Sequence, residues 1–229
     1  MCVNTQTPFL RFKPPETQGK RRAPLKPANL ANLSEGVDYG FAPGGVTRMV
    51  FPLVRRMIRE GTLRDAHWVA LDPAGPETIR AGGLTLHSVH LPKDRLKSYG
   101  IVKETLWGAA HHMVPDSSPA KDIFWTDDFS EYAYYNRVTA EMIGELDRRH
   151  DFDLFYVHDF QQLPMGQMLG PLKPKIYRWH IPFDQSAIPD QWKELLTAYF
   201  DSYDVIVVSA GRYREALKSF GYSGKVRVV

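Results

Sequence analysis

Residues 152–180 of this 229-residue chain read FDLFYVHDFQQLPMGQMLGPLKPKIYRWH. Two apolar runs of strand length, 152–158 and 175–180, frame this stretch. Similar runs elsewhere alternate with amphipathic segments of helix length, which is typical of βαβ units. We expect further strands at 67–71, 84–91, 204–209 and 225–229, and helices at 46–60, 94–112, 132–149, 191–200 and 212–220. The sequence therefore predicts an α/β protein with a doubly wound, mostly parallel sheet.

Composition excludes several classes of protein. Hydrophobic residues make up 43% of the chain, aromatic residues 12% and charged residues 24%, which fits neither a disordered chain nor a fibre. The single cysteine, Cys2, cannot form an internal disulfide, so a reducing compartment is expected, with the cytoplasm as the simplest choice. No run of about 18 apolar residues occurs, so no membrane association is expected.

Positive charge gathers near the start of the chain. Residues 11–26 contain six basic side chains and one acidic side chain, whereas the whole chain carries a formal net charge of +3. We interpret 1–27 as a basic, Pro-rich and flexible leader, and 28–229 as one domain. Because the remaining residues are nearly neutral, nucleic-acid binding is not expected. The final strand ends at Val229 without a closing helix, so we also expect a piece of a longer protein.

Polar residues stand where two of the predicted strands end. His158 and Asp159 follow one strand, and His180 ends the next. In open parallel sheets, ligands bind beyond the carboxyl ends of the strands, so these three residues are expected to converge on one crevice. The alternative for each histidine is a hydrogen-bonded residue of the core.

A glycine pair, Gly44-Gly45, precedes the predicted helix that starts near Val46. Glycines at this place let a ligand approach the backbone, and the free amides of a first helical turn favour an anion such as phosphate. A plain turn into a helix is the alternative. Neither the dinucleotide fingerprint nor the P-loop pattern occurs in the chain.

Aromatic side chains are frequent before residue 151. Aromatic faces stack on the apolar faces of sugar rings, and tryptophan and tyrosine add hydrogen-bonding groups. Core packing is the alternative for each of them. Candidates for sugar contacts are Trp68, Tyr99, Trp107 and Tyr132. No metal-binding, thiol-redox or hydrolase motif accompanies them, so no metal site is expected.

The motifs at the strand ends carry a resemblance to a known family. Residues 155–166, FYVHDFQQLPMG, and residues 178–183, RWHIPF, resemble the V-H-D-Y-H-L-L-P and L-H-I-P-F-P segments of trehalose-6-phosphate synthases. Tyr99 with 106–111, LWGAAH, and residues 132–136, YAYYN, resemble the family's acceptor-binding segment and the helix after it. The resemblance extends over about residues 40–229.

This resemblance implies the Rossmann-like N-terminal half of a GT-B glycosyltransferase. The implied reaction is retaining glucosyl transfer from a nucleotide-diphosphate glucose (UDP-, ADP- or GDP-glucose) to a small sugar or sugar phosphate. No permanently bound cofactor is implied, and the partner implied in cis is a C-terminal GT-B domain; homo-oligomers are compatible with this reading. Without that domain we expect the isolated half to be inactive.

The family also implies roles for individual residues. Asp159 and His180 are implied as catalytic residues, with Asp159 on the acceptor and His180 on the donor glucose. Substrate-binding positions are Tyr99, Trp107, Trp68 and Tyr132. Gly44 and Gly45 match the glycine pair that faces the donor diphosphate.

Two alternatives stay open at this point. The family's early S-N-R segment has no arginine counterpart in Asn32-Leu33-Ser34, so the acceptor could differ, as in a trehalose-forming glycosyltransferase or a glucosylglycerol-phosphate synthase. The chain could also be a non-catalytic module that binds a sugar or a protein partner.

Overall fold

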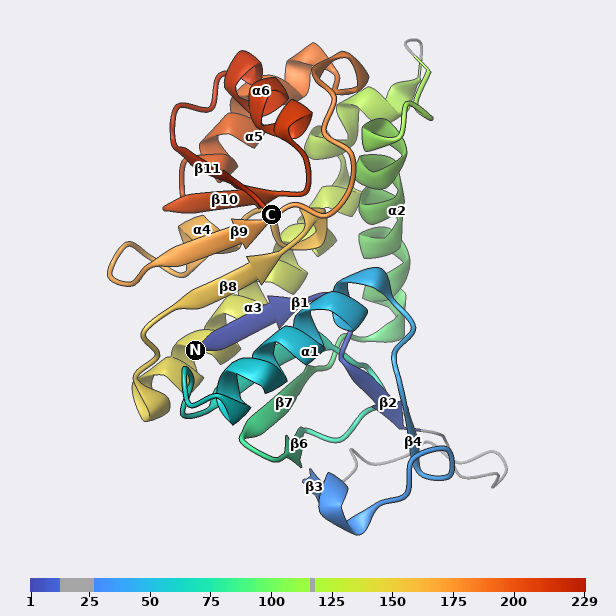
Figure 1. Ribbon diagram of the computed structural model, residues 1–229. Coiled ribbons are helices and arrows are strands. Elements are labelled where there is room, and N and C mark those ends of the chain that lie inside the picture. The colour runs from blue at the N-terminus through green and yellow to red at the C-terminus, as the bar shows by residue number, and fades with distance from the viewer. Residues whose placement is uncertain (13–26, 116–117) are drawn as a thin grey trace. The chain divides into compact units, whose positions relative to one another are not determined.

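The computed structural model describes residues 1–12, 27–115 and 118–229 of the chain, which divide into two compact units. The first unit is Met1–Leu91 and the second is Pro92–Val229. Both consist of β-strands with helices packed on them (Figure 1). The predicted α/β class is therefore confirmed.

In its described residues, 1–12 and 27–91, the first unit contains one α-helix and mostly short strands. Its elements are β1 (Cys2–Thr5), β2 (Leu10–Phe12), β3 (Ala28–Asn29), a 3₁₀ turn (Leu30–Asn32), β4 (Tyr39–Phe41), α1 (Gly45–Arg59), β5 (Ala66–Leu71), β6 (Thr78–Ala81) and β7 (Leu84–Val89). β1, β5 and β7 run parallel. β6 returns antiparallel to β7 across Gly82-Gly83. Both glycines have positive φ values of 49° and 75°, as a tight hairpin turn requires.

Residues 1–12 correct one expectation, because they were assigned to a flexible leader. Cys2–Thr5 instead forms a fully buried strand paired with β5. Its polar side chains form hydrogen bonds inside the fold: the Asn4 amide donates to the Val69 carbonyl, and the Thr5 hydroxyl accepts from the Trp68 indole. Because Asn4 and Thr5 are polar, the sequence pattern did not indicate a buried strand here. The rest of the proposed leader, 13–26, lies outside the described residues.

The second unit holds the longer helices and four strands. Its helices and strands are α2 (Lys93–Ala110), α3 (Asp127–His150), β8 (Phe155–His158), α4 (Met165–Met168), β9 (Lys175–Arg178), α5 (Lys193–Phe200), β10 (Val205–Val208), α6 (Gly211–Phe220) and β11 (Lys225–Val228). Short 3₁₀ turns cover Pro119–Trp125, Phe160–Gln162, Gln185–Ala187 and Asp190–Trp192. All four strands are parallel, in the order β8, β9, β10, β11.

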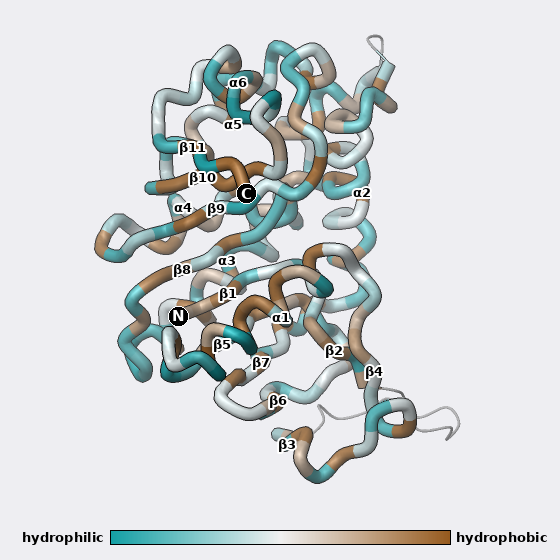
Figure 2. Tube along the Cα trace, viewed as in Figure 1, coloured by the Kyte–Doolittle hydropathy of each residue, from teal (hydrophilic) through white to brown (hydrophobic). Residues whose placement is uncertain are grey.

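The sequence pattern explains this second unit. The strands are short apolar runs, and Figure 2 shows brown stretches along β8 and β10 while α6 is largely teal. Behind β9, the Tyr177 ring stacks on Tyr203 at 4.6 Å between centroids and meets Phe200 of α5 at 6.2 Å. α6 ends at Gly221, whose φ of 117° is the left-handed cap that glycine accepts readily. Parallel strands place their carboxyl ends at one edge of the sheet, and the candidate residues lie there.

Candidate functional site

Asp159 follows β8 directly and has an unusual backbone conformation. Its φ of 69° and ψ of 170° fall in a region that is occupied almost only by glycine. The backbone is held there by a hydrogen bond from the Asp159 amide to the Arg178 carbonyl at 2.8 Å. A non-glycine residue in this region costs about 1–3 kcal/mol, and such strain is concentrated at functional sites.

The Asp159 carboxyl group is buried, with only 5% of the residue exposed. Burial raises the pKa of this carboxyl group from 3.8 to about 7, although hydrogen bonds from the backbone amides of His180 and Phe160 oppose that rise. The Oδ1 atom accepts from the His180 amide at 3.3 Å. Near neutral pH this group therefore changes between an acid and a carboxylate.

Two imidazoles meet beside this carboxyl group. His158 Nδ1 lies 3.0 Å from His180 Nε2, which is hydrogen-bonding distance. Burial lowers the pKa of His180 to about 4, with the Arg178 charge as the second cause. The pKa of His158 is also lowered, by burial and by the charges of His180 and Arg178. Both rings are therefore neutral at physiological pH. His158, Asp159 and His180 lie together, but the cavity beside them is lined by Asp159 and by neither imidazole.

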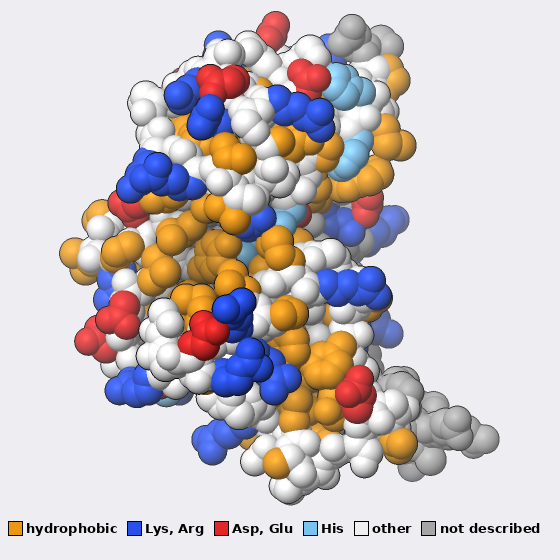
Figure 3. All heavy atoms as spheres, in the orientation of Figure 1, with side chains coloured by type: hydrophobic (Ala, Val, Ile, Leu, Met, Phe, Trp, Pro, Cys, Tyr) orange, Lys and Arg blue, Asp and Glu red, His pale blue; other side chains and the backbone are white. Residues whose placement is uncertain are grey.

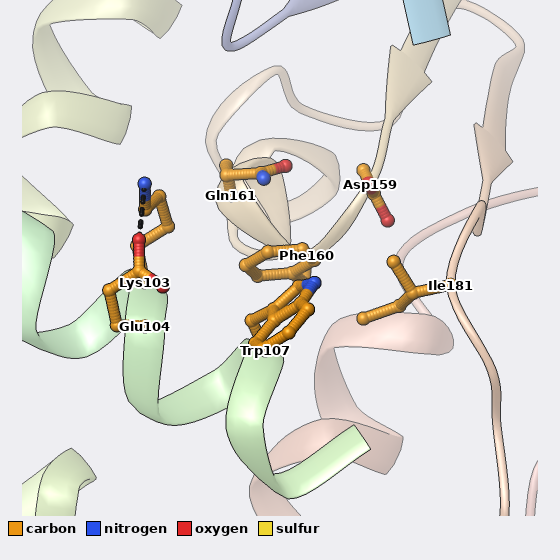
Figure 4. A pocket seen from close by; sticks show the side chains of 7 residues that line it. All are labelled: Lys103, Glu104, Trp107, Asp159, Phe160, Gln161 and Ile181. Atoms are coloured by element: carbon orange, nitrogen blue, oxygen red, sulfur yellow. Dashed lines mark ion pairs between the residues drawn. The ribbon is translucent and has the colours of Figure 1, made fainter. Parts of the chain in front are cut away.

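A cavity of about 290 Å³ opens next to Asp159, close to the lower limit of roughly 300 Å³ for small-molecule sites. Figure 4 shows the side chains that line the cavity. The Trp107 and Phe160 rings are at the centre of the view, Asp159 and Ile181 are on one side, and Lys103 and Glu104 are on the other. The remaining lining residue is Gln161. The cavity combines an aromatic wall with a few polar groups, which is the usual composition of a small-ligand site.

Helix α2 supplies the aromatic wall and a charged edge. Trp107 is 37% exposed, and its ring stacks on His111 at 4.2 Å between centroids. One turn earlier, Lys103 Nζ lies 2.7 Å from Glu104 Oε1. The sequence analysis missed Lys103 and Glu104, but their place one helical turn before Trp107 would have located Lys103 on the same face.

Three of the predicted substrate-binding residues lie in the core. The rings of Tyr99 and Tyr132 are parallel, 6.2 Å apart, and buried. Tyr132 donates to the Phe160 carbonyl at 2.6 Å, so it supports the cavity wall from behind. Trp68, in the first unit, is fully buried and donates to Thr5 Oγ1 at 2.7 Å. None of the three lines the cavity, and this burial corrects the prediction that they contact substrate directly.

Gly44 and Gly45 lie in the first unit, where Gly44 caps α1 and Gly45 is its first residue. No side chain caps the amides of the first turn, and that turn contains no acidic residue. A Cβ atom added at Gly45 would meet nothing within 4 Å. Anion binding at the start of α1 therefore stays a prediction.

Neither a metal centre nor a membrane-spanning helix was found in the described ranges. Within 1–12, 27–115 and 118–229, no group of three or more metal-ligating side chains comes together. No helix in these ranges has the length and apolar character needed to cross a membrane. The chemistry that the site offers is hydrogen bonding and aromatic packing.

Comparisons with known proteins agree with this fold. Residues 119–215 match the family model described as trehalose synthase, N-terminal domain. A solved trehalose-6-phosphate synthase superposes with a TM-score of 0.64 over 99% of this chain, at 18% identity. The chain has the fold of trehalose-6-phosphate synthases. The expected Rossmann-like half of a GT-B fold is thus confirmed.

Two further trehalose-phosphate synthase structures were solved with ligands. The UDP-forming enzyme of Burkholderia xenovorans, in complex with glucose 6-phosphate, has a TM-score of 0.59, 20% identity and 83% coverage of this chain. A structure from E. coli bound with UDP-2-fluoro glucose has a TM-score of 0.62, 18% identity and 89% coverage. This chain spans 41% and 48% of the lengths of those two chains. No curated protein matches the sequence.

Proposed function

We propose that the chain provides the acceptor-binding half of a retaining glucosyltransferase of the trehalose-6-phosphate synthase type. The observation that carries the proposal is a single cavity lined by a strained, buried carboxyl group, Asp159, and by the exposed face of Trp107. The acceptor is a hexose or a hexose phosphate, and the donor is a nucleotide-diphosphate glucose.

Each side chain contributes a different interaction in this proposal. The ionised Asp159 accepts hydrogen bonds from acceptor hydroxyl groups, and the apolar face of the sugar packs on Trp107. The neutral His180 ring hydrogen-bonds the glucosyl group of the donor. In the first unit, the free amides at the start of α1 are a separate candidate for binding a diphosphate. The acceptor hydroxyl attacks from the side on which the diphosphate leaves, and stabilisation of that leaving group lowers the barrier.

Acceptor binding by an Asp159→Ala variant tests the proposal. Loss of a charge-assisted hydrogen bond should cost about 1.5–3 kcal/mol, which is roughly 10- to 150-fold in affinity. Titration calorimetry or saturation-transfer NMR with glucose, glucose 6-phosphate and glycerol 3-phosphate would measure the loss and rank the acceptors. Asp153→Ala is the matched control, because Asp153 is exposed and does not line the cavity.

Acceptor binding should also depend on pH. Because burial raises the pKa of Asp159 to about 7, the accepting carboxylate is lost as the pH falls below that value. Affinity should therefore rise between pH 6 and pH 8 in the native chain and stay flat in Asp159→Asn. Unchanged affinity in Asp159→Ala, or binding by none of the three compounds, would contradict the proposed site.

A further inference from the structure

Arg178, the last residue of β9, is a buried cation with few partners. It is 8% exposed, and its Nε atom has no hydrogen-bond partner. No carboxylate in the described ranges lies within ion-pair distance of it. Its side chain donates a hydrogen bond to the Tyr156 hydroxyl. An arginine stays protonated in proteins, and burying its charge without a counter-ion is costly, so this position calls for an explanation.

The neighbours of Arg178 provide that explanation. In the β8–β9 register, Arg178 is the partner of His158, so the two side chains lie on the same face of the sheet. His158 in turn lies 3.0 Å from His180. The positive charge contributes to the lowered pKa of both histidines, after burial. The guanidinium group is thus part of the surroundings of both rings.

Other charged and titratable groups of this unit contact His158 or line the cavity beside Asp159. On β8, the Tyr156 ring lies 4.1 Å from His158, and Asp159 follows the strand. On α2, Lys103 and Glu104 line the same cavity but neutralise each other. An ionised Asp159 favours a protonated His180, because opposite charges attract. Arg178 acts in the opposite direction, since a second cation beside the ring is repelled.

We propose that Arg178 is a positioning residue: its buried guanidinium, on the β9 residue paired with His158, adds to burial in disfavouring a proton on the His158–His180 pair. The effect of Arg178 on the two rings does not depend on the proposed function. Its use does rest on that function: it presents His180 to the sugar as a neutral hydrogen-bonding ring. With both rings neutral, one proton lies between Nδ1 of His158 and Nε2 of His180. Without Arg178, the pair should take up a second proton at a higher pH than in the native chain.

The imidazole charge can be measured in the full chain without any ligand. NMR titration of the histidine ring signals between pH 4 and pH 8 should show His180 neutral down to about pH 4 in the native chain. In Arg178→Met, the pKa of His180 should rise by about one pH unit or more, the usual size of the effect of a neighbouring charge. Arg178→Lys retains the charge and should keep the ring neutral.

Controls separate charge from structure. Arg149→Met removes an exposed arginine of α3 and should leave the histidine titration unchanged. Thermal unfolding and amide spectra report whether each variant folds, and Arg178→Gln is the second neutral variant if Arg178→Met does not. A native His180 that titrates near 6.5, or a folded neutral variant whose His180 titrates as in the native chain, would overturn the inference. Failure of sugar binding alone would overturn the proposed function and leave this result standing.

Discussion

At the scale of the residue, Asp159 combines properties that reduce stability. Its backbone lies in a region that favours glycine, and its carboxyl group is buried. Two well-formed backbone hydrogen bonds hold it in place, from its own amide to Arg178 and from the His180 amide to its carboxylate. A fold that retains such a residue for packing alone would gain from replacing it. We therefore interpret the cost as a consequence of function.

The stability cost can be measured through its dependence on pH. The native pKa of about 7 exceeds the ordinary value of 3.8, so the native state binds more protons than the unfolded state between these values. The stabilising contribution of protonated Asp159 to the free energy of unfolding is fully present below pH 3.8. It is lost as the pH rises from 3.8 to about 7, at about 1.4 kcal/mol per pH unit. Asp159→Asn should therefore be more stable than the native chain by about 2–4 kcal/mol at pH 8.

Urea unfolding at pH 4 and pH 8 checks this expectation. The gain should shrink towards zero at pH 4, where the native carboxyl group is protonated and resembles the amide of asparagine. Asp153→Asn, an exposed acidic position, should show no such gain at either pH. An equal gain of Asp159→Asn at both pH values would mean that the residue's charge is not the cause.

At the scale of the element, helix α1 has an uncapped first turn and a basic last turn. Arg56 and Arg59 lie in the last turn, where positive charge stabilises the helix dipole, and Figure 3 shows basic side chains gathered over this region. The first turn has neither an acidic residue nor a side-chain cap. A helix start without these groups has amides available for an external anion.

A methyl group at Gly45 tests that role. Because an added Cβ meets nothing within 4 Å, Gly45→Ala should fold normally and gain about 0.4–1 kcal/mol from reduced flexibility of the unfolded chain. The methyl group would nevertheless block close approach of a diphosphate, so the response of the 45–47 amide signals to UDP-glucose should require about tenfold more ligand. Gly100→Ala in α2 has the same free space and should leave that response unchanged.

Periodicity and composition predicted the long helices and the apolar strands, since those patterns are local. They did not predict β1, because Asn4 and Thr5 form hydrogen bonds with partners more than sixty residues away. The meeting of His158, Asp159 and His180 followed from strand order. The backbone conformation of Asp159 depends on its hydrogen bond to Arg178 of β9, and its raised pKa depends on burial. Burial of Tyr99 and Tyr132 could not be distinguished from exposure, because aromatic residues serve both the core and sugar sites.

At the scale of the whole molecule, acceptor binding and leaving-group stabilisation are separable. All residues that line the cavity belong to the unit Pro92–Val229. Among the described residues of that lining, Lys103 is the sole cation, and Glu104 already neutralises it. The cavity as described can hold a hydroxyl-rich sugar, but it has no unpaired positive charge for a departing diphosphate.

The 229-residue chain should therefore bind an acceptor sugar without transferring glucose to it at a measurable rate. The solved synthases are about twice its length, since it spans 41% to 48% of them. Loss of a single preorganised donor to a developing oxyanion costs about 10²- to 10³-fold in rate, and here the main cations are lacking from the cavity. Saturable glucose-induced shifts at cavity amides, with no trehalose or trehalose phosphate formed from UDP-glucose, would agree. Turnover by this chain alone would contradict this expectation.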